Sequence, residues 1–239
     1  MNRFAVITPI PFLVETFIQY SIIRKAIRKK IIELRIADLR EYGTGNYRQI
    51  DDTPFGGGSG MIMMPEPLSS AIDDMISWMG RGRVKVFYPS PQGQVWNQER
   101  AIKFGNEKNI IMICGHYKGI DERVIKKYVT NEFSIGDFIM TNGEIPSMTI
   151  LDSIIRLIPG TLNNIDSALT DSFSNQLLDH PHYTQPRVFQ DMAVPEVLLN
   201  GNHKKINSWR KNQREIQTKV KRPDLWNKYL IRKENGEKQ

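Results

Sequence analysis

Three short apolar stretches of this chain each run directly into a loop rich in glycine, proline or polar residues, and this repetition constrains the fold most. The stretches are residues 84–88, 109–114 and 138–140, which lead into the loops at 89–93, 115–119 and 141–146. In open sheets of parallel strands, ligands bind beyond the carboxyl ends of the strands, where such loops converge. Glycine and proline there allow backbone N–H and C=O groups to approach a ligand closely. The repetition therefore predicts one ligand site built from three loops.

The first 160 residues alternate between strand-like and helix-like patterns. Strand patterns lie at 4–7, 31–39, 84–88 and 110–114, and helical patterns lie at 17–27, 65–79, 98–104 and 146–158. This alternation predicts an α/β fold in which helices cover both faces of a parallel sheet. A long glycine-rich loop at 41–67 interrupts the pattern, and its length is typical of either a functional loop or a flexible linker.

The pattern changes beyond residue 160. We expect an α/β domain at 1–160, a polar linker at 161–171 and a small all-α domain at 172–239, with helical segments at 194–199, 204–220 and 223–232. No strand alternation is visible in the C-terminal part, and only its last few residues look frayed.

The positive charge of the chain is concentrated at one end. Residues 1–179 hold 20 Lys or Arg against 20 Asp or Glu, whereas residues 180–239 hold 13 against 6, which accounts for the whole net charge of +7. A basic block on a neutral body is typical of a protein that binds a polyanion such as RNA. A solvated helix face followed by a basic tail would give the same composition, so charge alone leaves both interpretations open.

The cysteine count and the N-terminus indicate a soluble cytoplasmic protein. Cys114 is the single cysteine, so no intrachain disulfide can form and a reducing compartment is expected. Pro9, Pro11 and Glu15 interrupt the apolar N-terminus, which argues against a signal peptide. No apolar run approaches the roughly 20 residues of a membrane-spanning helix.

Simple motifs for phosphate and metal binding are weak or missing. The sequence contains neither G-x-G-x-x-G nor G-x-x-x-x-G-K-[ST]. Asp179, His180 and His182 lie close together in sequence, but Pro181 between the histidines fits a rigid turn better than a tetrahedral site, so we predict no metal site. By spacing alone, Arg156 forms an ordinary surface pair with Asp152, and Asp171 is an ordinary N-cap.

Several ordered motifs across nearly the whole chain carry a resemblance to a known family. They are FGGGSGM at 55–61, SPQG at 90–93, GIDERV at 119–124, SIGD at 134–137, GEIP at 143–146, RLIPG at 156–160, DSF at 171–173, and LLD and PHYT at 177–184. In order and spacing the chain resembles the bacterial tRNA (guanine-N1)-methyltransferases, the TrmD type of the SPOUT superfamily. The resemblance implies a SPOUT-type parallel sheet with a deep trefoil knot, a homodimer with a composite active site, S-adenosylmethionine as methyl donor, and methylation of the tRNA guanosine immediately 3′ of the anticodon.

The resemblance also assigns roles to the loops. By similarity, the positions that hold S-adenosylmethionine are Tyr88, Pro89, Ser90, Gly115, Tyr117, Ile135, Gly136, Asp137, Phe138, Ile139, Met140, Gly143 and Pro146. A mostly apolar cleft with a few directed polar groups is what such a ligand needs.

The same resemblance implies the catalytic groups. Asp171 matches the proposed general base that removes the N1 proton of guanine, and Arg156 would stabilise the negative charge that develops on O6. In the family these two residues meet across the dimer interface. The basic C-terminal residues expected to follow the tRNA backbone are Lys204, Lys205, Arg210, Lys211 and Arg214.

Lys118 departs from the family pattern, in which a glutamate is common. The family is thought to use Mg²⁺ near that carboxylate, and a lysine would repel the ion, which argues against Mg²⁺ dependence here. Two alternatives stay open: a SPOUT-like methyltransferase of another RNA nucleoside, against which the segments of Asp171 and Arg156 argue, and a non-catalytic basic RNA-binding protein.

Overall fold

The structure is a computed structural model that describes residues 1–162, 171–173 and 175–236. It divides the chain into two units, Met1–Ile165 and Asp166–Gln239, each of which is described here by itself. Most of the expected linker at 161–171 lies outside the described residues. No helix within the described ranges is both long enough and apolar enough to cross a bilayer.

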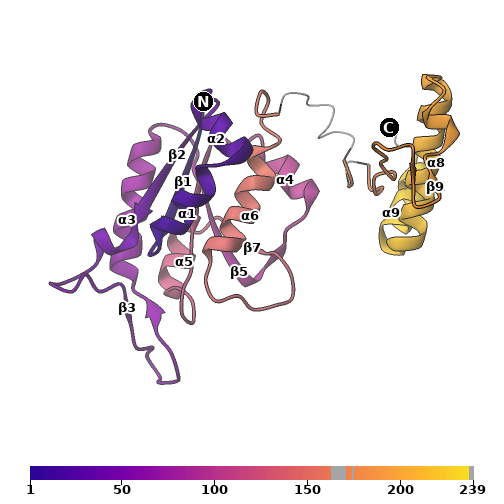
Figure 1. The fold of residues 1–239 in the computed structure, drawn as a ribbon. Helices are drawn as coiled ribbons and strands as arrows, with labels where there is room; N and C mark the ends of the chain where they lie inside the picture. Colours follow the sequence, from indigo (N-terminus) through magenta and orange to yellow (C-terminus); the bar gives the residue numbers. More distant parts are fainter. Residues whose placement is uncertain (163–170, 174, 237–239) are drawn as a thin grey trace. The chain divides into compact units, whose positions relative to one another are not determined.

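Five strands of the first unit form one sheet in the spatial order β2-β1-β6-β5-β7 (Figure 1). Every neighbouring pair is parallel, as the alternating sequence pattern predicts. The strands are β1 (Asn2–Thr8), β2 (Ile32–Asp38), β5 (Lys85–Val95), β6 (Asn109–Ile113) and β7 (Asn131–Ser134). The carboxyl ends of all five therefore lie at one edge of the sheet.

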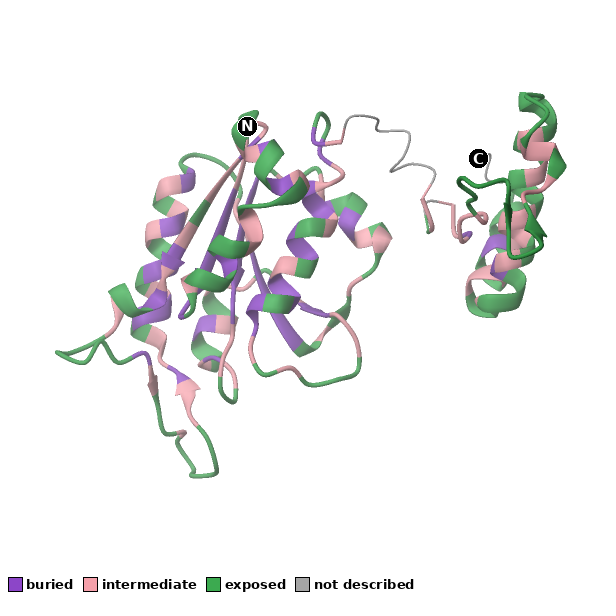
Figure 2. Ribbon diagram, in the orientation of Figure 1, coloured by how far each residue is buried: buried purple, intermediate pink, exposed green. Residues whose placement is uncertain are grey.

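Helices cover both faces of this sheet, because successive side chains of a strand point to opposite faces. Phe4 and Val6 of β1 belong to one buried cluster, and Ala5 and Ile7 belong to the other. Figure 2 shows the buried strands between helices that are buried on one side only. On the first face lie α1 (Pro11–Ile18), α2 (Ser21–Arg28), α4 (Gln98–Phe104) and α6 (Glu144–Ile155), and on the second lie α3 (Pro65–Met79) and α5 (Glu122–Tyr128).

An aromatic cluster joins the sheet to α4 and α6. Phe87 of β5 makes edge-to-face contacts with Phe104 and Phe133, at centroid distances of 4.9 and 5.0 Å. Trp96 packs on Phe133 at 4.8 Å and donates a hydrogen bond of 2.9 Å from its indole nitrogen to Ser153 Oγ of α6. The cluster therefore fixes α6 against the sheet beside the carboxyl end of β5.

Between β2 and α3 the chain leaves the sheet in the segment that we call the flap, residues 43–64 (Figure 1). It follows the short 3-10 helix η1 (Leu39–Tyr42) and contains an antiparallel pair, β3 (Asp51–Asp52) and β4 (Ile62–Met63). Ile50 and Met63 are fully buried, whereas Tyr47 and Phe55 are fully exposed. The long loop expected at 41–67 is thus anchored at its base and exposed at its tips.

The sequence patterns of the first unit missed one strand and one helix break. No strand is expected at β7, whose sequence Asn-Glu-Phe-Ser has no apolar run, and the apolar stretch at 138–140 lies in the loop that follows it. The helical pattern at 17–27 is divided between α1 and α2, since Tyr20 is extended and Ser21 has a φ of 63°. Apolar periodicity alone does not mark such a break.

The second unit is mainly helical. The 3-10 helix η2 (Glu196–Leu198) precedes α8 (His203–Lys221) and α9 (Pro223–Glu234), which pack together, and the Tyr229 hydroxyl donates a hydrogen bond of 2.9 Å to Glu215 Oε1. Upstream, Leu178 N–H donates to Thr218 Oγ1 of α8 at 2.8 Å. The chain before α8 is therefore held on that helix.

The expectation that this C-terminal part is all-α needs a correction. The strands β8 (Val188–Phe189) and β9 (Met192–Ala193) form an antiparallel hairpin. Gln190 and Asp191 between them both have positive φ, 47° and 61°, as a two-residue hairpin turn of the I′ type requires. Strands of two residues are too short to show an alternating pattern, so no sequence signal marks them.

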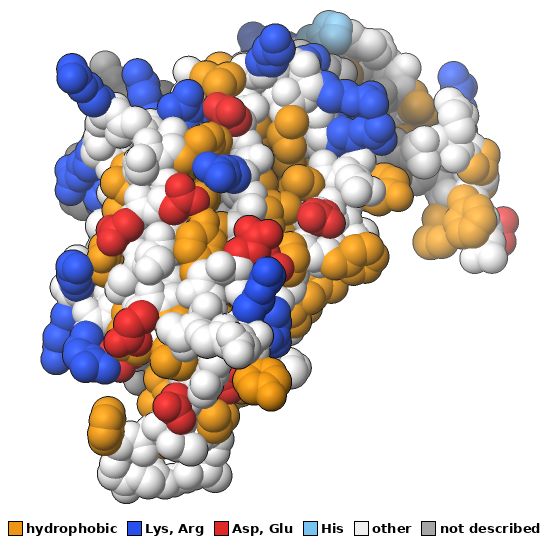
Figure 3. Space-filling model, turned by 90° about the vertical axis from the view of Figure 1, so that its left-hand side faces the viewer, with side chains coloured by type: hydrophobic (Ala, Val, Ile, Leu, Met, Phe, Trp, Pro, Cys, Tyr) orange, Lys and Arg blue, Asp and Glu red, His pale blue; other side chains and the backbone are white. Residues whose placement is uncertain are grey.

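Charges of both signs are mixed over the face shown in Figure 3. Lys and Arg side chains lie there among Asp and Glu side chains, with apolar groups between them. This distribution agrees with the equal numbers of acidic and basic residues up to residue 179.

We expect Phe87→Ala to lower the free energy of unfolding by about 3–5 kcal/mol, because it leaves a cavity among three aromatic neighbours. Urea titration followed by circular dichroism measures the change. Phe55→Ala is the matched control, since the Phe55 side chain is fully exposed, and it should change stability by less than about 0.5 kcal/mol. Equal losses in the two variants would contradict this description of the core.

Candidate active site

The predicted loops at 115–119 and 141–146 line one cleft together with residues 88–91 of β5. The loop predicted at 89–93 is instead a bulge inside β5, where the pairing with β7 shifts between Pro89 and Gln94. The volume of the cleft is about 590 Å³, within the ~300–1,000 Å³ range of small-molecule sites. Twelve of the thirteen positions expected to hold a ligand line it, and Asp137 does not, its side chain being exposed. The twelve are Tyr88, Pro89, Ser90, Gly115, Tyr117, Ile135, Gly136, Phe138, Ile139, Met140, Gly143 and Pro146.

Two of these loops cross each other without a side chain between them. Gly143 N–H donates a hydrogen bond of 2.8 Å to the Gly115 carbonyl. A Cβ at Gly143 would lie 2.5 Å from the backbone nitrogen of Gly115 and 2.9 Å from Cα of Cys114. Since only backbone atoms stand there, no side-chain movement can relieve the clash. The cleft therefore requires glycine at position 143.

The Tyr88 ring forms a wall beside this crossing. A Cβ at Gly115 would lie 2.7 Å from that ring, so the ring packs directly on the bare backbone of the loop. Burial, and then the nearby Glu132 carboxylate, raise the pKa of the Tyr88 phenol. Tyr88 is therefore a neutral phenol at physiological pH and supplies no charge to the cleft.

Two hydrogen bonds between Ser134 and Gly136 shape the loop after β7. The Ser134 hydroxyl donates to the Gly136 carbonyl at 2.9 Å and accepts from Gly136 N–H at 3.1 Å. Gly136 has a φ of 149°, and the Phe138 ring folds back to where its Cβ would stand, 2.5 Å away. This loop thus presents apolar side chains to the cleft, while the Ser134 hydroxyl and the Gly136 backbone groups bond to each other.

A fully buried carboxylate, Glu144, joins three elements beneath the cleft. Its Oε1 accepts hydrogen bonds from the Thr8 hydroxyl at 2.6 Å and lies 2.7 Å from His116 Nε2, which is also 3.0 Å from Oε2. Thr8 ends β1, His116 follows β6, and Glu144 begins α6, so one side chain fixes all three. A buried carboxylate needs such partners, because an unpaired charge there would be very costly.

The single cysteine lies beside this network but is not a nucleophile. Cys114 is fully buried and donates a weak hydrogen bond to Ser147 Oγ at 3.4 Å. Burial raises the pKa of the thiol well above its usual range, and the charge of Glu144 adds to the effect. Because the thiolate is the reactive form, this excludes covalent catalysis by Cys114.

The flap closes one side of the cleft. Gly60 and Met61 contribute to its lining, and Lys118 N–H donates to the Met61 carbonyl at 3.0 Å. Met63 N–H donates to the Gly119 carbonyl, also at 3.0 Å. The glycine-rich motif at 55–61 therefore adjoins the loop after β6.

Sequence reasoning predicted the loops of the site but gave several of their residues no ligand-holding role. Gly60, Met61, His116 and Lys118 are among the further residues that line the cleft, and Glu144 lies beneath it. These residues lie within or next to motifs that the sequence shows as glycine-rich loops. Their roles depend on contacts between loops far apart in the chain, which no local pattern reports.

The two expected catalytic residues belong to different units. Arg156 is the half-buried C-cap of α6 in the first unit, and Asp171, also half-buried, belongs to the second. The expected tRNA-binding residues all lie on α8. Four of them are exposed, while Arg214 is half-buried and donates from Nε to the Leu178 carbonyl at 3.2 Å; the exposed four are Lys204, Lys205, Arg210 and Lys211.

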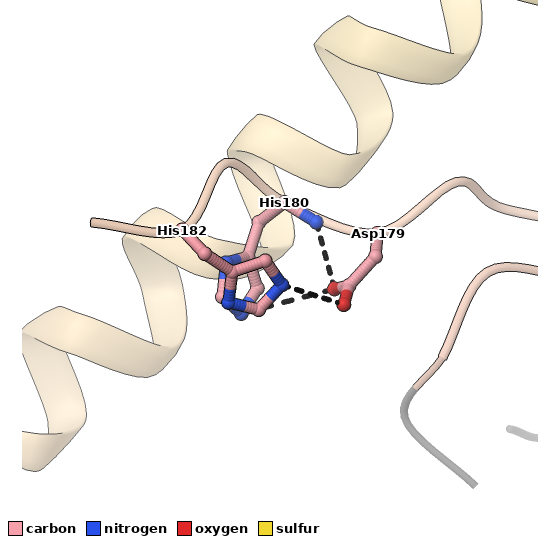
Figure 4. A group of neighbouring side chains, drawn as sticks. All are labelled: Asp179, His180 and His182. Carbon is pink, nitrogen blue, oxygen red and sulfur yellow. Dashed lines mark hydrogen bonds and ion pairs between the residues drawn. The ribbon is translucent and has the colours of Figure 1, made fainter. Parts of the chain in front are cut away.

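A second group of side chains, in the second unit, has the composition of a metal site. Asp179, His180 and His182 bring one ligand atom each to within 4.8 Å of one another (Figure 4). Burial opposes ionisation of Asp179, but hydrogen bonds from the His182 ring and the His180 backbone outweigh it, so the pKa of the carboxyl is lowered. Asp179 is therefore a carboxylate at neutral pH.

Together, the parallel sheet and the glycine-lined cleft at its carboxyl edge define an α/β protein with a mostly apolar cleft of the size of a small-molecule site. A sequence profile of the family described as tRNA (Guanine-1)-methyltransferase TrmD matches residues 2–228. The chain belongs to this family.

Curated relatives match over the same length, and each carries the name tRNA (guanine-N(1)-)-methyltransferase. A protein of Clostridioides difficile is 44% identical over 226 residues, which cover 95% of this chain and 98% of the relative. One of Staphylococcus carnosus is 44% identical over 229 residues, covering 96% and 92%. One of Finegoldia magna is 42% identical over 234 residues, covering 98% and 99%. The similarity thus includes both units.

We expect Glu144→Gln to lower the free energy of unfolding by about 1–3 kcal/mol, because the neutral amide loses the charge that holds His116 and retains one acceptor oxygen. Urea titration measures the change. Glu15→Gln, at an exposed position of α1, is the matched control and should have little effect. If both variants lose the same stability, Glu144 does not join the three elements.

Proposed function

We propose that the chain transfers a methyl group from S-adenosylmethionine to N1 of the guanosine immediately 3′ of the anticodon in tRNA. The full-length match to the methyltransferase family supports the activity, and the glycine-lined cleft is the observation that supports a site for the methyl donor. The same match disfavours a non-catalytic RNA-binding protein and a methyltransferase of another nucleoside.

The residues of the cleft fit S-adenosylmethionine. Its volume suits a nucleoside with a short amino-acid chain, and its walls combine apolar side chains such as Ile135 and Met140 with exposed backbone at Gly115. When bound there, S-adenosylmethionine supplies an electrophilic methyl group on a sulfonium. The Tyr88 ring and the loop after β7 would shield it from water, and backbone N–H and C=O groups of the lining would orient its polar edges.

Guanine N1 carries a proton and its lone pair is delocalised, so a base must remove that proton as the methyl group arrives. We assign this role to the Asp171 carboxylate, which would take the proton from N1. Loss of the proton moves negative charge to O6, where the Arg156 guanidinium would stabilise it. The two side chains would thus act on the same N1–C6–O6 amide group of guanine, Asp171 at N1 and Arg156 at O6.

We also propose that the chain is knotted at this site. β7 lies at the edge of the sheet, and Glu144, the first residue of α6, bonds to Thr8 at the end of β1. Since β5 and β6 lie between β7 and β1, the chain passes their carboxyl ends on its way from β7 to α6. The close crossing of Gly143 over Gly115 supports a deep trefoil knot, a rare arrangement among proteins.

The active site is proposed to be shared between two copies of the chain. Asp171 and Arg156 belong to different units, and the resemblance to the family implies that the two residues meet across a homodimer interface. We further propose that the protein works in the cytoplasm, because tRNA is found there and because the reducing conditions there keep the Cys114 thiol reduced.

The loop after β6 does not fit a divalent ion at position 118. Lys118 brings an ammonium group to the lining of the cleft, where a carboxylate would be needed to hold Mg²⁺. We therefore assign no step of the reaction to Mg²⁺ at this position.

We expect Asp171→Asn to keep the affinities for S-adenosylmethionine and tRNA but to lower the single-turnover rate by about 10²–10⁴-fold, because the amide cannot accept the N1 proton. Rapid-quench assays with excess enzyme measure the rate. The control is Asp191→Asn, in the hairpin turn between β8 and β9, which should react at the normal rate. A near-normal rate in Asp171→Asn would remove Asp171 as the base.

We expect the affinity for tRNA to fall steeply as salt rises, because each phosphate contact releases counterions. Replacing both Lys204 and Lys205 by Gln should reduce the slope of log K against log[salt] by about 1.5, at ~0.7–0.9 per contact. Replacing Lys29 and Lys30, an exposed pair after α2, is the control and should leave the slope unchanged. A flat salt response of the unmodified protein would mean that the charges on α8 only keep the protein soluble.

A further inference from the structure

The group formed by Asp179, His180 and His182 gathers three metal-ligating atoms outside the methyl-transfer cleft. His182 Nε2 lies 2.9 Å from Asp179 Oδ2, and His180 Nε2 lies 3.8 Å from Asp179 Oδ1. Figure 4 shows both imidazole rings next to the same carboxylate. The ring centroids of the two histidines are 4.4 Å apart. All three side chains belong to the second unit.

The hydrogen bond on the other side of His180 determines which of its nitrogens carries a proton. His180 Nδ1 lies 3.0 Å from the Pro181 carbonyl oxygen, and a carbonyl can only accept, so Nδ1 carries the hydrogen. In the neutral ring, Nε2 then presents a lone pair toward Asp179 Oδ1, which is itself an acceptor. At a separation of 3.8 Å, both acceptors attract a cation placed between them, either a second ring proton or a metal ion.

The supporting contacts fit a metal ion. A tetrahedral ion with bonds of ~2.0–2.1 Å holds its ligand atoms about 3.3 Å apart. The three ligand atoms here lie within 4.8 Å of one another, so small side-chain movements bring them to that spacing. The Nδ1–H of His180 bonded to a backbone carbonyl is the usual outer contact of a histidine that binds metal.

Hydrogen bonds from two backbone N–H groups, those of Asp179 and His180, position Asp179 and its carboxylate. Asp179 N–H donates to Ser172 Oγ at 2.9 Å, and His180 N–H donates to Asp179 Oδ1 at 2.7 Å. The ring of His180 also contacts Trp209 of α8, at a centroid distance of 6.2 Å. The ligands are thus positioned before any ion arrives, although Pro181 between the histidines made a rigid turn the better interpretation of the sequence.

We propose that Asp179, His180 and His182 form a site for a divalent transition metal ion such as Zn²⁺. Two imidazoles and one carboxylate suit Zn²⁺ and Co²⁺ better than Mg²⁺ or Ca²⁺, which prefer oxygen ligands. The Nε2 atoms of both histidines and one oxygen of Asp179 bind the ion. The ion replaces the hydrogen that His182 Nε2 donates to Asp179, and the neutral His182 ring then carries its hydrogen on Nδ1. The His182 side chain is largely exposed, which leaves a fourth position open to water. The ion holds residues 179–182 together beside α8.

The test uses the full-length protein without an affinity tag, freed of metal with a chelator and then titrated with Zn²⁺ against a chromophoric competitor. We expect one Zn²⁺ per chain, and Co²⁺ in its place should give the intense visible absorption of a four-coordinate ion. His180→Gln and His182→Gln should each weaken Zn²⁺ binding at least tenfold. Circular dichroism and binding of S-adenosylmethionine by the first unit show whether each variant is folded.

His203→Gln is the matched control, because His203 is an exposed histidine of the same unit at the start of α8. It should bind Zn²⁺ like the unmodified protein. The proposal is overturned if the unmodified protein binds Zn²⁺ no more tightly than the folded His180→Gln or His182→Gln variant, if His203→Gln loses as much affinity, or if Co²⁺ shows only the weak spectrum of a six-coordinate ion. None of these results depends on methyl transfer, so they leave the proposed function untouched.

Discussion

At the carboxyl edge of the sheet, the loop after β7 passes the loop after β6 so closely that no side chain fits between them. Gly143 and Gly115 are joined there by a backbone hydrogen bond of 2.8 Å, and a Cβ on Gly143 would meet backbone atoms at 2.5 Å. Immediately after this crossing, Glu144 bonds to Thr8 and lies against His116. These contacts hold the loops after β6 and β7 to each other and to the end of β1, and both loops line the cleft.

This arrangement separates the tasks of the proposed enzyme. The first unit supplies a mostly apolar cleft, in which Tyr88 is a neutral phenol and Lys118 is the one lysine among the described residues of the lining, while Glu144 is fully buried beneath it. The excess positive charge lies in the C-terminal region, where four exposed basic side chains of α8 are available to a polyanion. Such a division suits a reaction in which a small donor and a large nucleic acid must be bound at the same time.

The sequence predicted the parallel α/β sheet and the cleft well, because both leave local signals. Buried strands of a parallel sheet are apolar runs, and loops that approach a ligand are rich in glycine and proline. The structure departs from the prediction where the signal is weak or non-local. The edge strand β7 is too polar to appear as an apolar run, and β8 and β9 are two residues long. The tie from Glu144 to Thr8 joins residues 136 positions apart, which no sequence window contains. The tautomer of His180 likewise depends on a carbonyl contact that only coordinates reveal.

The most direct test of the account is nucleoside analysis of tRNA after reaction with S-adenosylmethionine that carries an isotopically labelled methyl group. Unmodified tRNA transcripts with guanosine 3′ of the anticodon are incubated with the purified full-length protein, digested and analysed by mass spectrometry. The account predicts label only in 1-methylguanosine, from that one position, and none in transcripts where another base replaces the guanosine. Label in a different nucleoside, or no transfer by a protein that binds both substrates, would contradict it.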